Sequence, residues 1–142
     1  MDDLNKFVEQ AVRKLVLRTW QALTTATPVK TGFARAGWIP TSGAPEPGPE
    51  ESVASRAKGI TKKERESLAR LQATALFSKS SQLVQTIAKG YTLKQGPVFI
   101  VNNVRYVVFL NEGSSAQAPA MFVESSISLA VAATLRDLAG GA

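Results

Sequence analysis

The sequence contains no cysteine and no histidine. These absences exclude disulfides, thiol nucleophiles, the usual zinc ligands and the imidazole that most often serves as general base. A nucleophilic serine would lack its common partner, so we predict no catalytic residues, no metal site and no cofactor. Glu112, beside a glycine, is the first candidate for acid–base work, but a solvated loop glutamate or a subunit salt bridge is the favoured interpretation.

Long hydrophobic runs are also missing. The longest uncharged apolar segment, Ser125 to Leu135, is interrupted by serine and threonine and falls short of the roughly 20 residues of a membrane-spanning helix. The N-terminus begins Met-Asp-Asp and lacks the basic start and apolar core of a signal peptide. We therefore expect no membrane partner and a chain that stays in the compartment where it is made.

The composition is that of a folding protein with a basic surface. The 142 residues are 44% hydrophobic, which fits one domain over residues 1–142 with a single core. Seventeen Lys and Arg face eleven Asp and Glu, for a net charge of +6. Such a surplus attracts polyanions or acidic protein surfaces without choosing between them.

The first half of the chain predicts a helix, a strand and a loop. Helical spacing of apolar residues predicts an amphipathic helix over 2–25, which Thr27-Pro28 ends because proline cannot continue the hydrogen-bond ladder. After a turn at 29–32, aromatic and branched residues over 33–41 fit a strand. Three prolines, two glycines and three glutamates in residues 42–51 exclude regular structure there, so we predict a mobile loop over 42–60.

The second half predicts further helices around a short strand. Thr61 and Glu64 fit a capping box that opens a helix at 61, continuous or broken near 78–81, with Gly90 as its C-cap. Residues 97–101 predict a buried strand, whereas 106–110 fit either its hairpin partner or one helical turn. A last helix is predicted from Pro119 to Gly140-Gly141. The fold class is therefore α+β: a small, mainly antiparallel sheet flanked by N-terminal and C-terminal amphipathic helices, with a long mobile loop.

Each predicted helix has an apolar stripe expected to face the core. The stripes consist of Leu4, Val8, Ala11, Val12, Leu15, Val16, Ala22 and Leu23 in the first helix, Leu68, Leu71, Ala75, Leu76, Leu83, Val84, Ile87 and Ala88 in the middle, and Val123, Ile127, Ala130, Val131, Thr134, Leu135 and Leu138 in the last.

A basic cluster follows the predicted loop. It consists of Arg56, Lys58, Lys62, Lys63 and Arg65. These side chains fit contacts to DNA phosphates, which would weaken steeply with salt. A solvated helix face is the alternative, and the more common one.

Two segments, taken together, resemble a known family. Residues 27–38 read TPVKTGFARAGW, and residues 100–106 read IVNNVRY before a glycine loop and Gln117-Ala118-Pro119. This ordered pair resembles the tail-completion, or neck, protein family of tailed bacteriophages, which includes the minor tail protein Z of lambda-like phages. The chain departs from that pattern at four positions: Phe33, Arg105, Val107 and Asn111.

The resemblance implies a structural virion protein of the neck or tail, assembled in the host cytoplasm. It would form a ring of identical copies, a hexamer as the family implies, that completes the tail and joins it to the head connector or stopper, the tail terminator or the tail tube. A tail terminator, or a DNA-binding accessory protein using residues 56–65, are the alternatives. The implied protein-contact residues are Thr27, Pro28, Lys30, Thr31, Gly32, Arg35, Trp38, Asn102, Asn103, Tyr106, Glu112, Gly113, Gln117 and Pro119.

Overall fold

The computed structural model describes residues 2–28, 32–105, 107–112 and 121–140. It confirms the predicted α+β class, with helices dominating and one two-stranded antiparallel sheet. In chain order the elements are α1 (Asp2–Ala26), α2 (Phe33–Ala36), β1 (Ile39–Ser42), the 3-10 helix η1 (Val53–Arg56), α3 (Lys62–Gly90), the 3-10 helix η2 (Leu93–Gln95), β2 (Val98–Val101), α4 (Val107–Asn111) and α5 (Phe122–Gly140).

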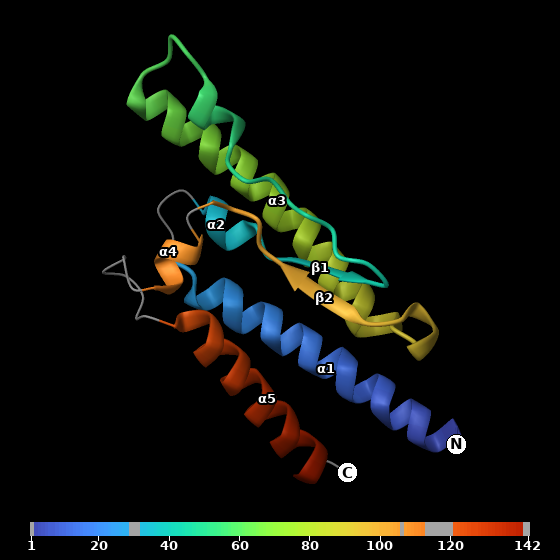
Figure 1. The fold of residues 1–142 in the computed structure, drawn as a ribbon. Coiled ribbons are helices and arrows are strands. Elements are labelled where there is room, and N and C mark those ends of the chain that lie inside the picture. Colours follow the sequence, from blue (N-terminus) through green and yellow to red (C-terminus); the bar gives the residue numbers. More distant parts are fainter. Residues whose placement is uncertain (1, 29–31, 106, 113–120, 141–142) are drawn as a thin grey trace.

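Helix α1 lies at the centre of the molecule. It packs against α5 on one side and α3 on the other, and the sheet lies alongside α3 (Figure 1). The N-terminal part of α3 extends beyond the end of α1, accompanied by η1 (Figure 1). The main core therefore forms around α1, from Val16, Trp20, Leu23, Trp38, Val84, Ile87, Tyr91, Val107 and Phe122.

The sheet is shorter at its start than the sequence predicts. The strand expected over 33–41 is wrong in its first half, because residues 33–36 form α2 and only Ile39–Ser42 pair with β2. The turn of helix buries Phe33, Ala34 and Ala36 against Ala73 of α3. That contact outweighs the local β preference of an aromatic residue.

Helix α3 is continuous, which settles the question of a break at 78–81. Its predicted start is confirmed, since the Glu64 amide donates to the Thr61 hydroxyl at 3.1 Å. Gly90 is not the C-cap: it is the last helical residue, and the Tyr91 amide closes the helix on the Ile87 carbonyl at 3.0 Å.

The region after β2 is helical, so the hairpin alternative for 106–110 is wrong over the described residues 107–110. The last helix begins at Phe122, three residues later than predicted, and ends at Gly140. Asn111 explains this start, because its side-chain oxygen accepts from the Val123 amide at 2.8 Å. Pro119 lies outside the described residues.

The predicted apolar stripes differ from the buried faces. Val16 and Leu23 of α1 and Val84 and Ile87 of α3 are buried as expected, but Leu4 is 59% exposed. In the first half of α3 the buried side chains are Ala69 and Ala73, whereas Leu68 and Leu71 are exposed. In α5 the buried face is Phe122, Ser126, Ala130 and Thr134, whereas Ile127, Val131 and Leu135 are exposed. Hence the first half of α3 and the part of α5 after Phe122 turn several of their larger apolar side chains outward.

Candidate interaction surfaces

Two of the predicted contact residues, Thr27 and Trp38, are buried within the chain. The Trp38 indole N–H donates to the Thr27 hydroxyl at 2.8 Å, and that hydroxyl donates to the Leu23 carbonyl at 2.6 Å. The Trp20 indole in turn donates to the Trp38 carbonyl at 3.0 Å. These hydrogen bonds connect the end of α1 to the start of β1. Thr27 and Trp38, which belong to the segment that resembles the neck family, therefore stabilise the fold of this chain. A contact of these residues with another protein stays a prediction.

The two predicted asparagines after β2 are also engaged inside the chain. Asn102 donates to the Ala34 carbonyl at 2.8 Å and accepts from the Val104 amide at 3.0 Å. Asn103 is exposed, yet its amide donates to the Gly48 carbonyl at 3.0 Å. They therefore pin α2 and the connection over residues 43–61 to the end of the sheet.

Four further predicted contact residues lie near the surface or in a turn. Gly32 has a φ of +88°, a left-handed conformation that strains residues with a Cβ. Pro28 and Arg35 are half-buried, with the Arg35 guanidinium 6.0 Å from the centre of the Phe77 ring. Glu112 is exposed after α4. The remaining predicted residues lie outside the described part of the chain: Lys30, Thr31, Tyr106, Gly113, Gln117 and Pro119.

The five residues of the basic cluster have different surroundings. Arg56 pairs with Glu51, and Arg65 donates to the Ala54 carbonyl at 2.5 Å. Lys58, Lys62 and Lys63 are exposed, and among the described residues none of them forms an ion pair. Three lysines rather than five basic residues are thus available to an external anion.

All three glutamates of the 43–61 connection form ion pairs. Glu46 pairs with Lys79 of α3 at 3.0 Å, Glu50 with Arg105 at 2.9 Å, and Glu51 with Arg56. The bond from the Arg56 side chain, followed by that from Ser55, lowers the pKa of Glu51. Hydrogen bonding to Glu50 raises the pKa of Arg105. The connection predicted as a mobile loop is therefore attached to the rest of the chain at several points, and its mobility stays a prediction.

One exposed apolar surface lies on the outer side of α5. Ile127, Val131 and Leu135 recur every four residues and are 43%, 37% and 60% exposed. Glu124 falls on the same helical stripe, three residues before Ile127. We call these four residues the α5 stripe. The side of α5 that contains Phe122, Ser126, Ala130 and Thr134 is buried and faces α1, and the Ser126 hydroxyl contacts the Ala22 carbonyl at 3.4 Å.

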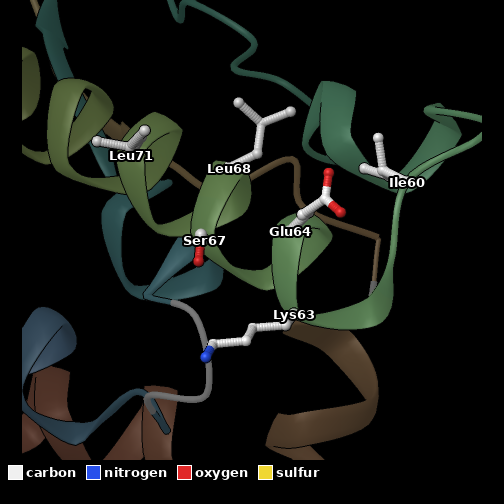
Figure 2. A pocket seen from close by; sticks show the side chains of 6 residues that line it. All are labelled: Ile60, Lys63, Glu64, Ser67, Leu68 and Leu71. Carbon is white, nitrogen blue, oxygen red and sulfur yellow. The ribbon is translucent and has the colours of Figure 1, made fainter.

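A second exposed apolar surface lies at the start of α3. Ile60, Leu68 and Leu71 border a shallow hollow of about 450 Å³ together with Lys63, Glu64 and Ser67 (Figure 2). We call this hollow the α3 groove. Leu71 is 68% exposed although it belongs to a predicted core stripe. Its lining residues belong to the first ten residues of α3 and the segment before it, and the N-terminal part of α3 extends beyond the end of α1 (Figure 1).

A structural role that the sequence did not reveal belongs to Asn111. Besides capping α5, its amide donates to both carboxylate oxygens of Glu124 at 3.0 and 3.1 Å. Its backbone carbonyl also accepts from the Met121 amide at 2.5 Å. Asn111 therefore joins α4 to the start of the α5 stripe. An asparagine before a helix is a cap signal, but the ten intervening residues hide it.

The spacing of Ser55 and Lys58 resembles that of the Ser-Lys pairs found in some hydrolases. The Ser55 hydroxyl donates to the Ser52 carbonyl at 2.7 Å, as a turn-forming serine does. We assign it to the structure of η1.

Within the described ranges, no three acidic side chains gather as metal ligands, and no helix has the length and hydropathy to cross a bilayer. In comparisons with protein-family models, curated proteins and solved structures, the chain matched none of them.

Proposed function

We propose that this protein is a structural component of a tailed-bacteriophage virion, forming a ring at the neck that completes the tail and joins it to the head. The observation that carries the proposal is the exposed apolar stripe on α5, where the helix turns Ile127, Val131 and Leu135 outward. Contiguous exposed apolar side chains of this kind mark protein contact sites. The resemblance of the two sequence segments to the neck family supplies the identity of the assembly.

A ring of identical subunits has a specific structural requirement. Each copy must present two different surfaces, because a head-to-tail contact joins unlike patches. This chain has two, the α5 stripe and the α3 groove, on helices that lie on opposite sides of α1 (Figure 1). The remaining surfaces would contact the head connector or stopper on one side and the tail terminator or tail tube on the other.

The test is the composition of virus particles. We expect the chain in purified particles of the phage that encodes it, and a ring of it between head and tail by electron microscopy. Val131→Asp should abolish its incorporation, whereas Ala132→Asp, an exposed position one residue further around α5, should not. A chain absent from particles, and unable to bind purified connectors or tails, would refute the proposal.

The exposed lysines favour one second candidate, a DNA-binding accessory protein. Lys58, Lys62 and Lys63 lie within six residues and have no ion-pair partner in the described structure. This function predicts submicromolar binding to duplex DNA that weakens steeply with salt and is lost on changing Lys62 and Lys63 to Glu. If no binding is detected at low salt, this candidate is eliminated.

A further inference from the structure

We infer that the subunit contact is made by the α5 stripe of one copy seated in the α3 groove of the next. The inference rests on the proposed ring and names the two surfaces that build it. Both are apolar, both are exposed, and they lie on opposite sides of α1, so they cannot cover one another within a chain. A second copy of the chain therefore provides an occupant for each.

The two surfaces have similar lengths. On α5, Ile127 and Leu135 are eight residues apart. On α3, Lys63 and Leu71, the first and last helical residues that border the groove, are also eight residues apart. At a rise of 1.5 Å per residue, each spans about 12 Å. A helix with apolar side chains every four residues suits such a groove, because its anchors lie along one line.

Their charges are complementary. Residues 56–70 hold six basic and two acidic side chains, a surplus of four positive charges, whereas α5 holds two acidic and one basic. The only charge on the α5 stripe is Glu124. Lys63, which has no ion-pair partner in the described structure, and Glu64 both border the groove, so the complementarity comes from the net basic charge of the surrounding segment 56–70. Glu124 already accepts from Asn111, but a carboxylate has room for further donors.

Symmetric alternatives fit less well. Two α3 grooves facing each other would bring two strongly basic segments together, which costs free energy. Two α5 stripes facing each other would leave both grooves uncovered. The head-to-tail contact covers both the α5 stripe and the α3 groove of every copy in a closed ring, and it brings the acidic end of the stripe to the net basic segment 56–70.

The absence of native cysteine allows a direct test. Leu71→Cys and Val131→Cys proteins, purified separately, are mixed and treated with a short thiol-specific crosslinker. We expect a covalent dimer in the mixture and little in either protein alone. Ala132→Cys, about 100° around α5 from Val131, should give no mixed dimer with Leu71→Cys. All three positions are exposed, so the variants should fold, which circular dichroism would verify.

Self-association of the protein without cysteine variants gives a second measurement. We expect Val131→Asp or Lys63→Glu to raise the dissociation constant at least about tenfold, as substitutions at central interface residues do. Ala132→Asp should leave it unchanged.

The outcomes separate this inference from the proposed function. The inference is overturned if the Val131→Cys homodimer is the main product. It is also overturned if no mixed dimer forms, which includes the case in which the chain stays monomeric. A ring in virions without the mixed dimer overturns the inference alone. A mixed dimer from a protein absent from virions supports the contact and refutes the neck function.

Discussion

The Trp38 indole donates its N–H to the hydroxyl of Thr27, 2.8 Å away, and both side chains are buried. The same hydroxyl donates to the Leu23 carbonyl. A single oxygen thus serves both the last turn of α1 and the tryptophan that precedes β1. This relationship explains why a threonine before Pro28 and a tryptophan eleven residues later occur together.

Removing the Thr27 hydroxyl should destabilise the fold. Thr27→Val keeps the shape of the side chain but leaves the buried Trp38 N–H without an acceptor, and we expect a loss of about 1–3 kcal/mol in the free energy of unfolding. Thr27→Ser, which retains the oxygen, should lose much less. Urea denaturation measures both, and equal stability of wild-type and Thr27→Val would contradict this role.

The burial of α5 residues predicts effects of very different size for two substitutions. Phe122 is 2% exposed and belongs to the main core, so Phe122→Ala should lower the free energy of unfolding by about 3–5 kcal/mol. Leu135 is 60% exposed, so Leu135→Ala should change the stability of a monomer by no more than about 0.5 kcal/mol. A large loss at Leu135 in dilute, monomeric protein would mean that the stripe is already covered within the chain.

Two glycines differ in the space around them. A Cβ at Gly37 would lie 2.8 Å from Val104 and 2.9 Å from the Asn102 side-chain oxygen, so Gly37→Ala should destabilise by about 1–3 kcal/mol. Gly90 has no neighbour within 4 Å of such a Cβ and ends a helix, so Gly90→Ala should stabilise by about 0.4–1 kcal/mol. Thermal unfolding followed by circular dichroism ranks the two variants. The reverse order would show that the space around Gly37 is not limiting.

The attachment of the 43–61 connection should weaken in acid. Bonds from Arg56 and Ser55 hold the pKa of Glu51 below its ordinary value, so the contact is stabilising above about pH 4.3 and is lost as the pH falls through the lower, folded value. Amide hydrogen exchange across residues 43–61 should therefore accelerate in that range, relative to its intrinsic pH dependence. In the Glu51→Gln variant, the amides of residues 43–61 should exchange faster at neutral pH and should no longer respond to acid in this way. If the variant keeps the acid response of the wild type, that response comes from other titratable groups.

Local signals in the sequence predicted several elements correctly. Proline after Thr27 ends α1 because it cannot donate in the ladder, and Thr61 starts α3 because its hydroxyl meets an unpaired amide. The apolar run before Asn102 forms β2, as its residue types predict, but the strand is half-buried and not buried, because the sheet has only two strands. These signals depend on a few neighbouring residues, so sequence alone was enough to interpret them.

Other features depended on contacts far along the chain. Phe33 entered a helical turn because α3 offered Ala73 for packing, and residues 107–110 became helical although their spacing also allowed a strand. Of the candidate site residues, Thr27, Trp38 and Asn102 form hydrogen bonds within the chain. The sequence pattern does not indicate the α3 groove, because it places Leu68 and Leu71 on a stripe that faces the core.

The sequence by itself determined the mixed helix and strand class, the end of α1, the start of α3, the basic charge and the lack of thiol and imidazole groups, because composition and local backbone preference set these properties. Only the tertiary structure decided which side of α3 and α5 faces inward. Both helices have apolar residues around much of their circumference, and periodicity cannot say which of those side chains the chain covers itself. In the first half of α3 and along α5 after Phe122, small residues such as Ala69, Ala73 and Ala130 allow close packing and are buried, which leaves larger side chains such as Leu71 and Leu135 exposed.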